Sequence, residues 1–122
     1  MSKLTLFLLV LLNAALLPAQ ELKPIELPQP SKDRGLPVMQ ALDVRASVRE
    51  WSQKPLSLQD LGDAVWAANG VNRADGKRTA SSAMNSQDVD VYVFMAEGVY
   101  VYNAQKHVLD PVVAGDYRDL PG

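Results

Sequence analysis

The spacing of hydrophobic residues changes once along this chain, from a helical period before residue 70 to alternation after residue 88. The helical part is clearest after Ser57, a good N-cap that is followed three residues later by Asp60, as in a capping box. The apolar face of this helix is formed by Leu58, Leu61, Val65 and Ala68. Because Asn69-Gly70 is typical of a helix end, the sequence predicts a helix between Ser57 and Gly70.

The alternating part predicts antiparallel strands. Its apolar positions are Val89, Val91, Val93 and Met95. Glu97-Gly98 is typical of a tight turn, and residues 99–102 are expected to form a second strand antiparallel to the first, which gives a β-hairpin. One further strand is expected from His107 to Val113. A short helix is also expected from Pro37 to about Val44, since proline suits a first helical position. The pattern therefore places two helices before a meander of strands.

The first nineteen residues have the pattern of an export signal. Lys3 supplies a positive start, an apolar run of about fourteen residues follows, and Ala19 is a small residue at a cleavage position. That run is shorter than the roughly twenty residues of a comfortable membrane span, so no stable span is expected after cleavage. Three prolines predict an extended, largely unpaired lead-in over residues 20–35, and residues 36–122 remain as the domain. The expected location is the periplasm or the cell exterior.

Composition excludes several classes of function. The net charge is −2 without a dense basic stripe, which does not indicate a nucleic-acid partner. The chain has no cysteine, so thiol nucleophiles and cysteine-ligated metals are impossible. Its single histidine, His107, has no acidic cluster nearby in sequence and is expected on a hairpin surface rather than on a metal.

Two arginines and a serine recur at every second residue as Arg45, Ser47 and Arg49. On an extended backbone these three side chains share one side, while Ala46 and Val48 face inward behind them. Guanidinium groups present planar forks of donors that suit phosphate oxygens, and a hydroxyl adds another. The motif predicts one face of a phosphate site; the alternative is a solvated strand edge.

Residues 71–87 show no regular period, and long loops of this kind are usually functional or disordered. The loop carries Lys77 and Arg78, which either attract an anionic nicotinamide cofactor or keep an exposed loop soluble. Asp88 and Asp90 are expected on a solvated strand face. Both tryptophans, at positions 51 and 66, are expected to pack in a core or interface.

Several ordered motifs together resemble the N-terminal half of the nitroreductase-like FMN-dependent oxidoreductases. They are RASVREW, KPLSLQDLGDAVWAANGVN and SSAMNSQ, followed by a hydrophobic strand. The similarity runs from about Leu36 to Arg118. The phrases WAANGVN, RADGKRT and GVYVYNAQKH resemble an exported branch related to the azoline-dehydrogenase-type oxidoreductases.

The resemblance implies an α+β fold that forms an intertwined homodimer with FMN at the subunit interface. It implies a flavin enzyme that passes hydride from NAD(P)H to a small organic acceptor. Matched residue by residue, the cofactor-binding positions are Arg45, Ser47 and Arg49 at the phosphate and ribityl chain, and Ser82, Asn85 and Gln87 in the loop facing the ring. No catalytic acid or base and no metal ligand is implied, because in such enzymes the flavin performs the redox chemistry.

Two departures from the family pattern concern the loop. Ser81-Ser82-Ala83 stands where the family commonly has Pro-Ser-Ala, and Asp88-Val89 stands where Pro-Trp often follows the glutamine. The chain is also about half as long as the family's catalytic domains. The alternative to an active enzyme is therefore a truncated, non-catalytic exported fragment, or a phosphate-ligand-binding module of the same fold.

Overall fold

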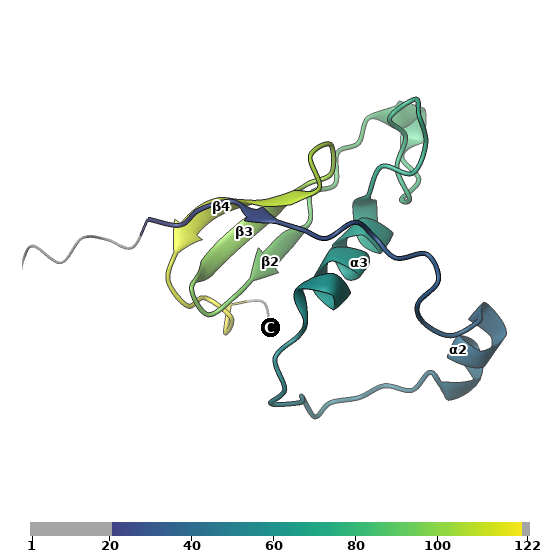
Figure 1. The fold of residues 1–122 in the computed structure, drawn as a ribbon, viewed down its shortest axis with the longest axis horizontal. Coiled ribbons are helices and arrows are strands. Elements are labelled where there is room, and N and C mark those ends of the chain that lie inside the picture. The colour runs from purple at the N-terminus through teal and green to yellow at the C-terminus, as the bar shows by residue number, and fades with distance from the viewer. Residues whose placement is uncertain (1–20, 121–122) are drawn as a thin grey trace, which may run out of the picture.

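Helix α3, Leu58–Asn69, begins where the capping residues predict. The structure, a computed structural model, describes residues 21–120, and the expected export signal at residues 1–19 lies outside them. The Ser57 hydroxyl accepts a hydrogen bond from the Asp60 amide at 3.1 Å, which satisfies one of the free N–H groups of the first turn. The helix lies beside an antiparallel sheet (Figure 1), so the α+β arrangement expected from the sequence is confirmed.

The buried face of α3 differs from the predicted one. Gly62, Val65 and Asn69 are buried, whereas Ala68 is exposed and Leu58 is 42% exposed. The lead-in crosses the helix at Gly62, where a Cβ atom would lie 3.4 Å from the carbonyl oxygen of Pro28. Because the helix packs against both the sheet and the lead-in, its buried stripe is rotated from the apolar face that the sequence suggests.

The sheet has the strand order β1-β4-β3-β2, and all neighbours are antiparallel. Its strands are β1, Ile25–Glu26; β2, Tyr92–Phe94; β3, Gly98–Asn103; and β4, Val108–Ala114. The hairpin and the further strand are therefore confirmed, with a register shift between Val99 and Tyr100. Figure 1 shows β3 and β4 as the long central strands.

The lead-in was expected to be extended and largely unpaired, and within residues 21–35 only the two residues of β1 form a strand. Ile25 pairs with Leu109 of β4, and Leu27 is 7% exposed. The sequence pattern missed this because only two residues form strand hydrogen bonds, between prolines that interrupt any longer strand. The lead-in is thus part of the domain's packing.

His107 is half-buried, which corrects its expected place on a hairpin surface. Its ring lies 2.8 Å from the Tyr102 hydroxyl through Nδ1 and 2.8 Å from the Pro28 carbonyl oxygen through Nε2. Since a carbonyl only accepts, Nε2 donates to Pro28. The histidine therefore joins the lead-in to the hairpin.

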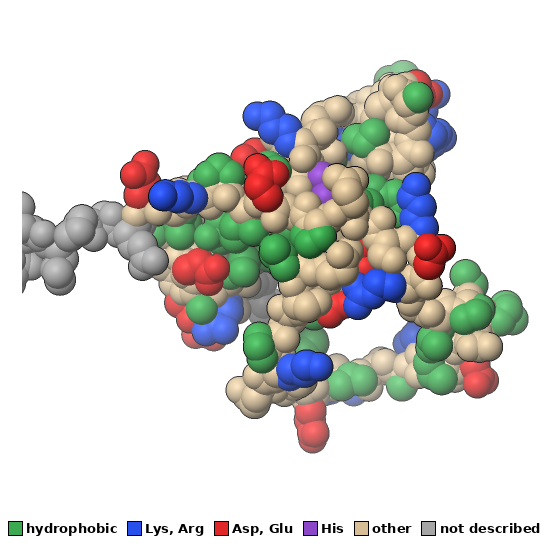
Figure 2. Space-filling model, in the orientation of Figure 1, with side chains coloured by type: hydrophobic (Ala, Val, Ile, Leu, Met, Phe, Trp, Pro, Cys, Tyr) green, Lys and Arg blue, Asp and Glu red, His purple; other side chains and the backbone are tan. Residues whose placement is uncertain are grey.

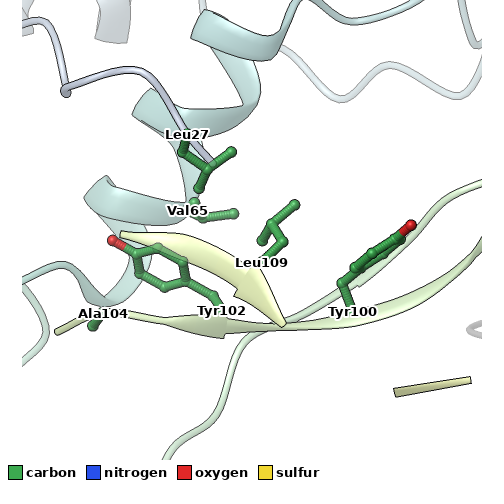
Figure 3. Packing of buried hydrophobic residues seen from close by; sticks show 6 residues of the cluster. All are labelled: Leu27, Val65, Tyr100, Tyr102, Ala104 and Leu109. Atoms are coloured by element: carbon green, nitrogen blue, oxygen red, sulfur yellow. The ribbon is translucent and has the colours of Figure 1, made fainter. Parts of the chain in front are cut away.

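The core lies between the sheet, α3 and the lead-in. Figure 3 shows its buried members, Leu27, Val65, Tyr100, Tyr102, Ala104 and Leu109. Leu109 is fully buried, and the alternating Val91, Val93 and Met95 pack against the cluster as their period predicts.

Helix α2, Val38–Val44, is confirmed within one residue, with Pro37 as its N-cap. It contributes no buried residue. Figure 2 shows hydrophobic side chains gathered on it, with an opening between this segment and the rest of the molecule. Trp51 is 85% exposed here, so its expected packing does not occur within the single chain. Among residues 21–120, no helix combines the length and the apolar character needed to cross a membrane.

Candidate functional site

The loop after α3 is held against the end of the helix. Thr79 donates its hydroxyl to the Trp66 carbonyl at 3.1 Å, and its amide donates to the Gly70 carbonyl at 2.8 Å. A bridge between Val71 and Arg78 closes the loop into a narrow pair of antiparallel segments. These bonds place the basic residues of the loop beside the serine-rich stretch that follows.

The serine-rich stretch forms a short turn, η1, Ala83–Asn85, which brings three predicted site residues together. The Ser82 hydroxyl accepts from the Gln87 amide at 2.8 Å, and the Gln87 side chain donates to Asn85 Oδ1 at 3.1 Å. Asn69 of α3 donates to the Val89 carbonyl at 2.8 Å and so fixes the far end of the loop. Ser82, Asn85 and Gln87 therefore belong to one hydrogen-bonded unit.

Three residues of this loop have left-handed backbone conformations. The φ angles are 51° at Met84, 57° at Asn85 and 52° at Gln87. Asparagine tolerates this region, whereas the other two residues adopt it at a cost of about 1–3 kcal/mol each. Met84 is fully exposed, so burial of its side chain does not compensate for that cost. Strain of this kind often accompanies ligand-binding loops.

A cavity of about 260 Å³ lies beside the loop. It is lined by Arg73, Lys77, Arg78, Ala80, Ser81, Ser82 and Asn85. A smaller cavity of about 70 Å³ shares Arg78, Ser82 and Asn85 and adds Asn69, Gln87 and Asp88 to its walls. Ser82 and Asn85 thus line both cavities. The charged residues of the larger cavity are all cationic, whereas the smaller one has Arg78 and Asp88.

Two pKa shifts bear on this charge. The side-chain hydrogen bond from Lys77 holds the pKa of the Asp75 carboxyl below its usual range, and the two groups form an ion pair at 3.0 Å. Burial raises the pKa of the Tyr102 hydroxyl, while the positive charge of Arg78 acts in the opposite direction. Arg78 therefore lies close enough to the core to influence a buried tyrosine.

Arg45, Ser47 and Arg49 are exposed and lie apart from that cavity. They follow α2 without forming a strand, and Figure 1 shows this segment and the η1 loop near opposite ends of α3. Ala46 and Val48 do not pack inward, and Val48 is 67% exposed. The expectation of apolar support behind the arginines is therefore wrong for the single chain, because no core element lies behind this segment.

Sequence reasoning did not select Arg73 and Asn69 as site residues. Arg73 donates from Nη2 to the Arg78 carbonyl at 3.0 Å, across the turn at Asp75-Gly76. That turn was the available signal, since it brings residues on its two sides together. The sequence places Asn69 only at the helix end, and nothing local in it connects Asn69 to Val89.

The described residues define an α+β chain with a strained polar loop over a basic cavity. Comparison with known proteins identifies the family to which such a chain belongs. The model of the nitroreductase family matches residues 42–120. That match spans well over half of the chain and includes both the Arg45–Arg49 motif and the loop with Ser82, Asn85 and Gln87. The chain belongs to the nitroreductase family.

Two relatives support the assignment. A protein of Methanocaldococcus jannaschii, described as a nitroreductase, is 36% identical over 69 residues, which are 52% of this chain and 35% of the relative. A crystal structure described as that of a nitroreductase from Ralstonia eutropha JMP134 has a TM-score of 0.74 and 40% identity, covering 80% of this chain and 47% of that one. The predicted family and nitroreductase-like fold are thus confirmed, and the chain spans half or less of the length of these two relatives.

Proposed function

We propose that the chain takes part in an FMN-dependent oxidoreductase that transfers hydride from NADH or NADPH to a small organic acceptor. The proposed enzyme is a homodimer that works in the periplasm or outside the cell. The nitroreductase family match over residues 42–120 is the observation that carries the proposal. The export signal and the location rest on the sequence pattern of residues 1–19 alone.

The residues present fit a flavin phosphate and ring in their chemistry. Arg45 and Arg49 are exposed, and within residues 21–120 neither forms an ion pair, so both guanidiniums are open to an anion. The Asn85 side chain can donate and accept hydrogen bonds, as the polar edge of a flavin ring requires. When bound, FMN would supply the two-electron redox chemistry, and the protein would supply placement and charge.

Within one chain the Arg45 and Arg49 side chains lie apart from the loop that carries Asn85, and this separation supports a site formed by two subunits. The segment from Leu36 to Leu58 contains exposed apolar side chains at nine positions, Leu36, Val38, Met39, Leu42, Val44, Val48, Trp51, Leu56 and Leu58. Such a patch is typical of an interaction surface. If this segment lies across a second copy, the arginines of one subunit can approach the η1 loop of the other.

The test is cofactor binding by the full chain. We expect purified protein to carry FMN, seen as flavin absorbance, and to oxidise NADH or NADPH when a quinone or nitroaromatic acceptor is present. Replacing Arg45 or Arg49 by alanine removes a charged hydrogen bond worth about 1.5–3 kcal/mol, so FMN affinity should fall by about ten- to a hundredfold. Arg118→Ala is the matched control, because Arg118 pairs with Asp116 at 2.6 Å outside the proposed site.

A second candidate function is binding of a phosphate ligand without turnover. The exposed Arg45 and Arg49, far from the η1 loop in the single chain, favour it. In that case the protein stays colourless after incubation with FMN, while other phosphate esters bind and are lost in the double arginine variant. An FMN affinity that the double variant leaves unchanged would contradict the proposed flavin site.

A further inference from the structure

The Arg78 guanidinium is buried at one of its nitrogens without a hydrogen-bond partner. Its Nε atom is shielded from solvent and has no acceptor within residues 21–120. No carboxylate in the same part of the chain pairs with Arg78. A buried donor of this kind is uncommon in folded proteins, because the lost hydrogen bond to water is not replaced.

The backbone around Arg78 is fixed by its neighbours. Its carbonyl accepts the hydrogen bond from Arg73, and its bridge to Val71 ties it to the residue after α3. The next residue, Thr79, is bonded to the helix end through both its hydroxyl and its amide. These bonds fix the backbone that carries the Arg78 guanidinium, although several neighbouring residues are exposed.

The adjoining cavity of about 260 Å³ has an excess of positive charge. Of its three cationic residues, Lys77 alone has a carboxylate partner, Asp75, within the described residues. The neighbouring Ser81 and Ser82 add hydroxyl groups that can donate to an anion. Arg78 lines this cavity and also the smaller one, so it stands where the two meet; the Asp88 carboxylate lines only the smaller cavity.

We propose that Arg78, with Arg73 and Lys77, binds the anionic group, a carboxylate or phosphate, of the substrate that reacts with the cofactor. This inference rests on the proposed oxidoreductase function, since Ser82 and Asn85 line the same cavity. A guanidinium fork suits either anion, and the compact cavity fits one such group with the attached part of a small molecule. Arg78 thereby favours anionic substrates over neutral ones.

The first experiment measures anion binding directly in the full chain. Benzoate and inorganic phosphate are titrated while the nitrogen–proton correlation spectrum of arginine side chains is recorded, with the Arg78 Nε signal assigned from its loss in Arg78→Lys. A saturable shift of that signal is expected with at least one anion. If the Arg78 signal is unmoved by both anions, the proposal is wrong, whether or not the protein binds FMN.

The second experiment identifies the substrate that carries the anion. The KM values of para-nitrobenzoate and neutral para-nitrobenzamide are compared in the FMN-loaded protein, and then the KM values of NADH and NADPH. Arg78→Lys keeps the charge but loses the fork, and should raise the KM of the recognised anionic substrate about tenfold or more, leaving para-nitrobenzamide unchanged. If the KM rises only for para-nitrobenzoate, Arg78 binds the anionic group of the electron acceptor. If it rises only for NADH and NADPH, or only for NADPH, Arg78 binds the nicotinamide cofactor.

Controls separate this site from folding and from the cofactor. Lys77→Gln alters an exposed side chain and should produce a smaller rise of the same selectivity, while Arg118→Lys should produce none. Equal KM increases for all substrates, or release of FMN from Arg78→Lys, would overturn the proposal by assigning Arg78 to the fold or to the cofactor. A chain that shows the anion-dependent shift but cannot be loaded with FMN would instead contradict the proposed oxidoreductase.

Discussion

Gly70 ends α3 for a steric reason rather than a conformational one. Its φ of −77° is accessible to any residue, so the left-handed helix end implied by Asn69-Gly70 does not form. A Cβ atom at this position would lie 2.6 Å from the Trp66 carbonyl oxygen and would overlap Trp66 Cδ1. The indole is also fixed, since Nε1 donates to the Val71 carbonyl at 3.2 Å. The glycine therefore allows the chain to turn closely over the tryptophan toward the basic loop.

Gly70→Ala should lower the free energy of unfolding by about 1–3 kcal/mol, because the methyl group forces the backbone or the indole to move. Chemical denaturation followed by tryptophan fluorescence measures the change. The matched control is Gly62→Ala inside α3, where the added Cβ meets its nearest atom at an ordinary 3.4 Å. That variant should be neutral or slightly more stable, because alanine favours the helix. Equal stability of the two variants would argue against the steric role of Gly70.

At the scale of elements, the lead-in is attached to the domain at two places. His107 joins it to the hairpin, and Leu27 donates its amide to the His107 carbonyl at 3.3 Å. Further along, Arg34 pairs with Asp60 and with Asp63 of α3, and the Ser31 amide donates to Asp63 at 2.8 Å. The lead-in is thus held by polar contacts to the hairpin and to α3, in addition to the pairing of β1 with β4.

Tyr102→Phe should weaken the first attachment. The substitution removes the hydrogen bond between the Tyr102 hydroxyl and His107 Nδ1, while the aromatic ring at position 102 still fills the core. The free energy of unfolding should therefore fall by about 1 kcal/mol. Hydrogen exchange should become faster at the Leu27 amide before it changes in β3. Tyr92→Phe is the control, since Tyr92 is 52% exposed on β2. Unchanged exchange at Leu27 would show that the histidine does not hold the lead-in.

The second attachment should be sensitive to acid. The Ser31 amide, and then the Gln59 and Arg34 side chains, lower the pKa of the Asp63 carboxyl from its ordinary value of 3.8. A carboxyl with a lowered folded-state pKa stabilises the fold above its ordinary value, and that contribution is lost as the pH falls through the folded-state pKa. Wild type should therefore exceed Asp63→Asn in stability near neutral pH, and the difference should shrink below about pH 4. A difference that stays constant in denaturation curves across that range would contradict this account.

At the scale of the whole molecule, the segment around α2 is the part that the single chain does not explain. Its apolar side chains are exposed, with Met39 at 75% and Leu42 at 59%, while the core between α3 and the sheet is complete without them. A short helix without packing is marginal in water. We therefore expect this segment to be stabilised by association with a second copy, as the proposed dimer requires.

Leu42→Glu should weaken that association while leaving the core intact. Burying a leucine is worth about 1.5–3 kcal/mol, so the dimer dissociation constant should rise by about tenfold or more. Sedimentation over a range of concentrations measures it. Leu120→Glu is the control, since Leu120 is 73% exposed but lies outside the segment. Equal dissociation constants for the wild type and Leu42→Glu would remove α2 from the interface.

The sequence by itself determined the features that neighbouring residues encode. The Ser57 cap, the alternation of residues 89–95 and the Glu97-Gly98 turn each depend on a few adjacent residues, so α3 and the meander could be predicted. The order of motifs was also enough to identify the family. Ser82, Asn85 and Gln87 were close in sequence, and they remain together in the loop.

The tertiary structure alone decided which distant residues meet. The contact of His107 with Pro28 spans 79 positions, and the bond from Asn69 to Val89 spans 20. No local pattern specifies such pairs, because they follow from how α3, the lead-in and the sheet pack together. The same packing rotated the buried face of α3 and left Arg45 and Arg49 exposed.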